Sequence, residues 1–420
     1  MRRAWRGKSS GVLNALWTGF FLVAIAAAWL QFLFGGDSAI FSRLLDALFV
    51  QSKLAFEVAL GLTGVLAFWL GMLRVAEKGG VIQLITRAVT PLFRRLMPEV
   101  PPEHPAVGAI VMNLSANVLG LDNAATPLGI QAMRELQSLN PRPDTASDAQ
   151  ILFFVLNASS VTLFPVTLLA WRAQLGAANP ADVFLPILLA TSCSTLTGLL
   201  AVASLQRIRL RDPVVLAYLG GFALVAGGLA FYLAGFGQAE MQVQSALISH
   251  SLLLSLIAAF LLAAWRRRIN VHEAFIEGAK EGFQTAVTII PHLVAMLAAV
   301  GVLRASGVLD GLLEGIRSGV EFFGWDSRFV DALPTALVKP FSGSGARAMM
   351  LDAMKTFGAD SFAGRLSVII QGSTETTFYV LAVYFGAVGI KNVRHAVGCG
   401  LLADFAGVVA AILITAWFFG

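Results

Sequence analysis

The chain has 420 residues, of which 57% are hydrophobic and only 13% are charged. Its mean hydropathy of +0.76 excludes an ordinary soluble globular domain. The formal net charge is +5, but the basic residues stand in short clusters beside apolar runs, which is typical of membrane topology and not of nucleic-acid binding. The two cysteines lie in apolar runs, and the histidines lack the spacing of metal ligands. We therefore predict a polytopic membrane protein without cofactor, metal or nucleic-acid partner.

Apolar runs near the roughly 20 residues that a helix needs to cross a bilayer predict the transmembrane segments. Crossings are expected at 12–34, 55–74, 150–171, 183–204, 213–235, 244–265, 284–304, 363–388 and 397–419. A cleavage site resembling that of a signal peptide occurs at Ala24-Ile25-Ala26. The apolar run continues well past this site, so an uncleaved first span with a cytoplasmic N-terminus is preferred.

Two further apolar segments are interrupted by polar residues. Segment 105–134 contains Asn113-Leu-Ser-Ala-Asn117 and Asp122-Asn123, and segment 329–355 contains Lys339-Pro-Phe-Ser-Gly-Ser-Gly-Ala-Arg347. Each half is too short for a hydrocarbon core of about 30 Å, so both segments are predicted to be re-entrant hairpins. The alternative is that each is one ordinary helix. The hairpin interpretation places most basic clusters on one side of the membrane, the cytoplasmic side, and is therefore favoured.

A repeated polar motif links the halves 1–210 and 211–420. Asn157-Ala-Ser-Ser-Val-Thr-Leu-Phe164 resembles Gln371-Gly-Ser-Thr-Glu-Thr-Thr-Phe378. An odd number of crossings between the two repeats would invert the second copy. Polar side chains inside a membrane are costly unless they line a site, so two related clusters indicate one site built from two halves. The predicted fold is an all-α membrane protein with an inverted repeat and two re-entrant hairpins.

The longest motifs resemble a known family. The stretch Asn113-Leu-Ser-Ala-Asn-Val-Leu-Gly-Leu-Asp-Asn-Ala-Ala-Thr-Pro-Leu-Gly129 resembles the spore maturation protein A signature. Phe275-Ile-Glu-Gly-Ala-Lys-Glu-Gly282, Pro340-Phe-Ser-Gly-Ser-Gly345 and the segment from Gln371 to Leu381 resemble spore maturation protein B. The resemblance implies a fusion, with the junction near 205–215, of two nucleoside-recognition "gate" halves. This group is similar to concentrative nucleoside transporters, which implies a transport fold but no particular substrate.

Candidate substrate-binding residues are the amides, hydroxyls and charges of the hairpins and motifs. In the first half they are Asn113, Ser115, Asn117, Asp122, Asn123, Thr126, Asn157, Ser159 and Ser160. In the second half they are Ser342, Ser344, Arg347, Gln371, Ser373, Thr374, Glu375 and Thr376. Asn and Asp also serve as turn and cap residues, and Ser and Thr also bond their own helix, so part of each set is expected to be local.

Three acidic residues are candidates for coupling an ion: Glu375, Asp404 and Asp122. Glu375 is the sharpest, because an ionisable side chain inside a span is rarely kept without use. The structural alternatives are a salt bridge of Glu375 to Arg347 and a structural pair of Asp404 with Arg394 or with another span. Arg347 follows a Gly-Ser turn that begins a short helix, a place that favours an anion.

The predicted function is secondary transport of a small polar metabolite, nucleoside-like, amino-acid-like or short-peptide-like. We expect a bacterial inner-membrane location, a bilayer environment, and sodium or a proton as the ion if transport is coupled; a homo-oligomer is compatible. No Walker motif is present, and no serine stands in the context of a hydrolase nucleophile, so an enzyme is not predicted. The rival is a membrane protein that binds a ligand or partner without transporting. A ferrous-iron gate ranks low, because the motifs offer mainly amides and hydroxyls.

Overall fold

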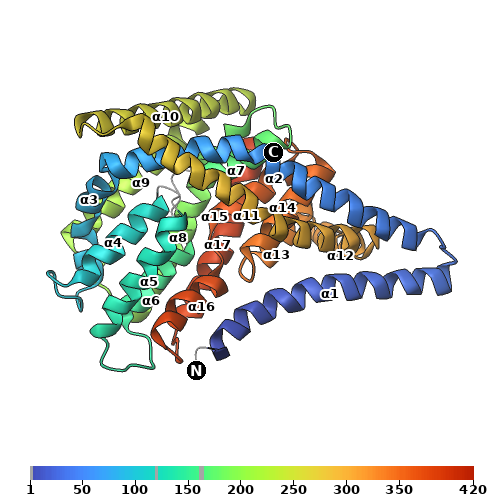
Figure 1. Ribbon diagram of the computed structural model, residues 1–420, viewed down its shortest axis with the longest axis horizontal. Coiled ribbons are helices and arrows are strands. Elements are labelled where there is room, and N and C mark those ends of the chain that lie inside the picture. The colour runs from blue at the N-terminus through green and yellow to red at the C-terminus, as the bar shows by residue number, and fades with distance from the viewer. Residues whose placement is uncertain (1–2, 119–121, 160–164) are drawn as a thin grey trace.

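The computed structural model describes residues 3–118, 122–159 and 165–420 (Figure 1). Within these ranges the chain is helical, and its only extended pairing is an isolated bridge between Thr145 and Asn392. Seven of the described helices are long and apolar enough to cross a membrane. The protein is therefore a multi-pass membrane protein.

The elements follow one another in two similar series. The first comprises α1 (Arg3–Gly35), α2 (Ile40–Gly79), α3 (Val81–Leu96), α4 (Pro105–Val118), α5 (Asp122–Ser138), α6 (Asp148–Ser159), α7 (Val166–Gln174), the 3₁₀ turn η1 (Pro180–Val183) and α8 (Phe184–Gln206). Helix α9 (Pro213–Ala234) connects it to the second. The second comprises α10 (Gln238–Arg266), α11 (Val271–Ala305), α12 (Val308–Phe322), η2 (Val330–Ala332), α13 (Leu333–Val338), α14 (Gly343–Phe357), α15 (Phe362–Ser373), α16 (Thr377–Val388) and α17 (Ala396–Phe419).

Local chemistry repeats along with this order. Gly80 ends α2 and Gly307 follows α11, both in the left-handed region with φ of 84° and 76°. Each glycine lets the chain turn sharply into an amphipathic helix, α3 or α12, in a conformation that costs other residues energy. The same glycine turn followed by an amphipathic helix in both series supports a duplication within the chain. The inversion of one copy relative to the other remains a prediction.

Helices α2 and α11 cross closely because small residues lie at the contact. A Cβ atom added to Gly278 would lie 2.3 Å from the carbonyl oxygen of Leu70, and one added to Gly282 would lie 2.6 Å from Cα of Ala67. Glycines four residues apart let two membrane helices bring their backbones together. Beside the crossing, Arg74 forms an ion pair with Glu277. The motif that begins at Phe275 is thus a packing motif in the described structure.

Two predicted spans differ from the structure. Segment 150–171 contains α6, which ends at Ser159, and α7, which begins at Val166, while segment 363–388 contains α15 and α16 with an extended break between them. The other seven predicted spans correspond to single long helices. Hydroxyl side chains compete for backbone hydrogen bonds, and this favours a break at each motif. The expectation of a continuous helix over 363–388 was wrong. In 150–171, residues 160–164 lie outside the described residues, and Pro165, just before α7, is not helical.

The interrupted segments form pairs of short helices, as their polar interruptions predict. Helices α4 and α5 contact each other, as do α13 and α14. The longest of the four, α5, has 17 residues, or about 26 Å at 1.5 Å per residue. None of the four is long enough alone to cross a core of about 30 Å. Whether each pair re-enters from one membrane face stays a prediction.

The centre of the molecule is built from α8 and α17, against which α6 and α15 pack. Besides the Arg74–Glu277 pair, ion pairs at two further places join the repeats. Arg394, just before α17, pairs with Asp148 at the start of α6 at 2.6 Å. Asp182, just before α8, pairs with Arg365 in the first turn of α15 at 2.8 Å. In Figure 1, α1 and the first part of α2 extend to the right of this core as an arm. The two ion pairs hold the broken helices to the long helices of the opposite repeat.

Candidate functional site

The second motif lies where the chain stops being helical. Helix α15 ends at Ser373, Thr374 is extended with φ of −147° and ψ of 169°, and α16 begins at Thr377. Successive side chains of extended backbone point to opposite sides. Accordingly Thr374 and Thr376 are 3% and 4% exposed, whereas Glu375 between them is exposed. The break therefore presents one carboxylate in a setting of buried hydroxyls.

The two motifs meet through their backbones. The N–H of Glu375 donates to the carbonyl oxygen of Ala158 at 2.7 Å, next to the end of α6. The following carbonyl, that of Ser159, accepts hydrogen bonds from Thr191 at 3.2 Å and Thr195 at 3.4 Å on α8. A helix end leaves carbonyls without intrahelical partners, and α8 and the second break supply partners here. One polar layer thus joins both motifs.

An amide and phenol network connects the first hairpin to both broken helices. Asn117 donates to Asn157 Oδ1 at 2.7 Å, and the Tyr384 hydroxyl donates to the same oxygen at 3.0 Å. Asn113 Nδ2 lies 3.2 Å from that hydroxyl, while its own Oδ1 is buried without a partner among the described residues. Gly129 makes room, since a Cβ there would lie 2.1 Å from the Tyr384 oxygen. This network brings α4, α6 and α16 together.

The tip of the second hairpin reaches the second break. Buried Lys339 donates from Nζ to the carbonyl oxygen of Gln371 at 2.8 Å, near the end of α15. Ser342 begins α14 by accepting from the Gly345 N–H at 2.9 Å. A Cβ on Gly343 would lie 2.9 Å from Thr376 Oγ1, so the N-terminus of α14 lies against the break. Helix N-termini carry a partial positive charge that favours anions.

Asp404 on α17 completes the layer. It is 5% exposed, and its Oδ2 accepts a hydrogen bond from Thr377 Oγ1 at 2.7 Å. Its Oδ1 is buried with no hydrogen-bond partner in the described parts of the chain. Lys339 and Glu375 both lie within electrostatic range of Asp404. A buried carboxylate oxygen without a partner has unused capacity to bind a cation or a proton.

Comparison with known proteins identifies the family. The Gate family, described as nucleoside recognition, matches residues 59–172 and 286–391, so each copy includes one amphipathic helix, one hairpin and one broken helix. Spore maturation protein B of Bacillus subtilis (strain 168) is 44% identical over 173 residues, covering 41% of this chain and 96% of that protein. Spore maturation protein A of the same organism is 42% identical over 149 residues, covering 36% of this chain and 76% of that protein. The chain belongs to the spore maturation protein A and B family. Both proteins are fused in it.

Within this family member, the structure brings much of the predicted site together. Asn117 and Asn157 bond each other, Glu375 bonds the Ala158 backbone, and Gln371, Ser342 and Thr376 adjoin the hairpin tip. Other predicted residues make local bonds. Ser115, Ser159 and Ser373 donate to carbonyls of their own helices. The local bonds match the structural alternative expected for Ser and Thr.

Several predicted residues do not take part in the contacts above. Asp122 and Asn123 begin α5 but their side chains lie outside the described residues, as does Ser160 entirely. Thr126 lies half-buried on α5, and Ser344 contacts the Ser342 hydroxyl at 3.3 Å. Arg394 pairs with Asp148, so the pairing of Asp404 with Arg394 was wrong. The other structural alternative, a partner on another span, stays open, because Asp404 accepts a hydrogen bond from Thr377 on α16.

Two residues of this spore maturation family member were missed as site residues. Tyr384 bridges Asn113 and Asn157, and Lys339 caps the carbonyl of Gln371. Lys339 carried a signal, because a charge between apolar runs is as costly as that of Glu375. Tyr384 carried none, since its role depends on contacts distant in sequence. Among the described residues, no group of three or more histidine, cysteine or acidic side chains could hold a metal ion.

Proposed function

We propose that this family member is a secondary transporter of a small polar metabolite. The observation that carries the proposal is the hydrogen bond between Glu375 and Ala158, which joins the break between α15 and α16 to the first motif in one polar layer. Broken helices that meet inside the membrane bind substrates and ions in many secondary transporters. The family description, nucleoside recognition, supports a ligand with hydrogen-bonding groups. The names of the two relatives concern spore maturation and specify no substrate.

The chemistry of the layer favours a zwitterionic or anionic substrate. The N-terminus of α14, with Ser342 as its cap and Arg347 in its first turns, suits a carboxylate or phosphate. Exposed Glu375 suits a cationic or hydrogen-bond-donating group. The amide oxygen of Asn113, which has no partner among the described residues, suits a hydrogen-bond donor on the ligand. Nucleoside-like, amino-acid-like and short-peptide-like molecules all combine such groups.

In this proposal the two repeats are inverted and exchange conformations to give alternating access. The basic clusters support a cytoplasmic N-terminus, and we propose the inner membrane of a bacterial cell as the location. Glu375, Asp404 and Asp122 are the candidates for coupling to sodium or a proton. A homo-oligomer would supply a fixed scaffold in the membrane, and the mass of the detergent-solubilised protein tests it.

Ligand-induced thermal stabilisation tests the proposal directly, because a compound that binds only the folded state raises its stability. Purified protein is screened against nucleosides, amino acids, dipeptides and dicarboxylates, each with and without sodium. A compound that stabilises the wild type is then tested on Glu375→Gln and on Glu240→Gln, a matched exposed glutamate at the start of α10. We expect the first variant alone to lose the shift.

Flux into liposomes then separates transport from binding. A stabilising compound that crosses protein-containing liposomes supports transport. A compound that binds through Glu375 without crossing in either direction or with either ion would favour the rival, a ligand-binding protein with a transporter fold. If the ligand raised the unfolding temperature of both glutamate variants equally, Glu375 would not be part of the binding site.

A further inference from the structure

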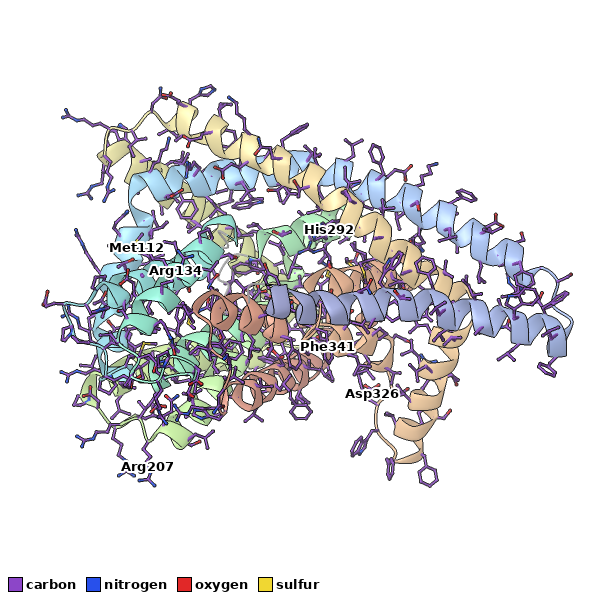
Figure 2. All side chains as sticks on the ribbon, turned by 60° about the horizontal axis from the view of Figure 1, so that its bottom comes forward. Met112, Arg134, Arg207, His292, Asp326 and Phe341 are labelled. Carbon is purple, nitrogen blue, oxygen red and sulfur yellow. The ribbon has the colours of Figure 1, made fainter. Side chains whose placement is uncertain are left out.

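Three hollows lie together at one end of the molecule, away from the polar layer. They surround the end of α3 and the connection 207–212 between α8 and α9. The first, of about 610 Å³, lies between α3 and the start of α9, and Arg87, Arg94, Arg95 and Val214 line it. We call this hollow the α3–α9 groove. Arg207 lines the third hollow, which shares Arg94 and Arg95 with the groove, and Figure 2 shows it at the lower left, far from the protruding loop that carries Asp326.

The α3–α9 groove is strongly basic. Its lining contains three arginines and no acidic residue. Arg95 reaches Asp212 only at 3.7 Å, and Arg94 makes one long contact, 3.5 Å, to the carbonyl of Pro102. Arg87 and Arg94 belong to none of the ion pairs formed between described residues. The hollow next to it adds Arg207 and Arg209, but also three acidic residues, Glu99, Asp148 and Asp212, so the anion site is confined to the α3–α9 groove. The guanidinium groups that line the groove therefore have donors available for an anion.

The depth of the groove in the membrane follows from the helices that flank it. Helix α8, a candidate span, ends at Gln206, and α9, another candidate span, begins at Pro213. Val214, in the first turn of α9, lines the groove. The Tyr218 hydroxyl, one turn further on, donates to the carbonyl of Ala88 on α3. The ends of spanning helices and an anchoring tyrosine mark the level of the lipid headgroups.

An apolar surface continues from the groove toward the bilayer centre. Along α9, Leu216, Leu224 and Phe231 are 52%, 76% and 85% exposed. Only Val215 and Leu233 of this helix are buried. A molecule with a phosphate in the groove could lay hydrocarbon chains along α9. A soluble phosphate would gain nothing from this surface.

We infer that the α3–α9 groove binds the headgroup of an anionic phospholipid, with the phosphate held by Arg87, Arg94 and Arg95 and the acyl chains along α9. Guanidinium groups bind phosphate oxygens in a bidentate way that matches their geometry. Zwitterionic lipids carry the same phosphate but also a cation that meets the arginine cluster. The groove therefore favours phospholipids with a net negative charge over zwitterionic phospholipids.

The test uses the full-length protein in nonionic micelles, titrated with phosphatidylglycerol or phosphatidylcholine while thermal unfolding is followed. The variant Arg87→Gln/Arg94→Gln removes two groove arginines. Its matched control is Arg134→Gln/Arg142→Gln, two exposed arginines that do not line the groove. Ser138, which lies between them in the sequence, contacts His104 at 3.4 Å, two residues from groove residue Pro102. A third titration uses glycerol phosphate without acyl chains.

We expect phosphatidylglycerol to stabilise the wild type and the control at concentrations where phosphatidylcholine has little effect. The groove variant should need about 30-fold more phosphatidylglycerol, at roughly fivefold for each arginine near an anionic membrane surface. The proposal would be overturned if phosphatidylglycerol and phosphatidylcholine stabilised the protein equally. It would also be overturned if both double variants lost the same amount of stabilisation by phosphatidylglycerol. Full stabilisation by glycerol phosphate would overturn the assignment to a lipid.

Discussion

The Glu375 N–H donates to the carbonyl oxygen of Ala158 at 2.7 Å, and this contact joins residues from the two repeated motifs. It is made by backbone atoms, so the side chain of Glu375 remains exposed beside buried Thr374 and Thr376. The arrangement separates two roles of one residue. The backbone holds the breaks together, and the carboxylate is available for a ligand.

Glu375→Pro and Glu375→Gln should therefore differ. Proline removes the N–H donor and leaves the Ala158 carbonyl without it, which costs about 1–3 kcal/mol in a buried site. The extended conformation of Thr374 already suits a following proline, so no additional strain is expected at Thr374. Glutamine keeps the donor and should leave stability close to wild type. Thermal unfolding in micelles measures both, and equal melting temperatures would show that the contact does not stabilise the fold.

Tyr384→Phe tests the network around the first motif. The substitution removes a hydroxyl that bonds Asn157 and contacts Asn113 in a buried place. We expect a loss of about 1–3 kcal/mol, because the amides lose a partner while the ring remains. Tyr379→Phe is the control, since that side chain is 53% exposed on the same helix. A similarly small loss of unfolding free energy in both variants would show that the network does not stabilise the fold.

Gly278→Ala tests the crossing of α2 and α11. The added methyl would lie 2.3 Å from the Leu70 carbonyl, so the two helices must separate. Overpacking of this kind typically costs about 1–3 kcal/mol. Gly315→Ala on α12 meets open space and should be neutral or stabilising, by up to about 1 kcal/mol from helix propensity. Opposite changes in melting temperature are expected, and a neutral Gly278→Ala would mean that the crossing is looser than described.

The sequence predicts long apolar helices well, because a run of about 20 apolar residues has few alternatives in a membrane. Hydropathy shows the spans but not the break after Ser373. A hydroxyl can bond its own helix and leave it intact, so the same residues fit both outcomes. Hydropathy also overlooks α3 and α12, whose charged faces lower the average although one side of each helix is apolar. Both amphipathic helices were absent from the predicted elements.

The polar motifs predicted where a site would form but not which atoms would form it. The link between the motifs uses the backbone of Glu375 and Ala158, and backbone contacts leave no mark in residue identity. Tyr384 could not be found because its partners Asn113 and Asn157 come from elements distant in sequence. Asp404 was found as a candidate because a carboxylate deep in the last span stands out by its cost alone. Its partner, Thr377, required the structure.

Asp404→Asn separates ion coupling from folding. Asparagine keeps an oxygen that accepts from Thr377 Oγ1, so the fold should tolerate it, with a change in unfolding free energy within about 1 kcal/mol. Asp404→Leu removes the acceptor and should cost about 1–3 kcal/mol. If Asp404 binds the coupling ion through its unpartnered Oδ1, the asparagine variant should still bind a ligand but lose the dependence of that binding on sodium or pH.

The measurement is the midpoint of ligand-induced stabilisation across sodium concentrations and pH values, compared between wild type and Asp404→Asn. Glu375→Gln is the contrasting variant, because it should lose ligand binding itself. Retention of the full ion dependence by Asp404→Asn would assign the carboxylate a structural role with Thr377 and leave Glu375 and Asp122 as the remaining coupling candidates. Loss of ion dependence without loss of affinity would assign the two functions to two different acidic residues of one polar layer.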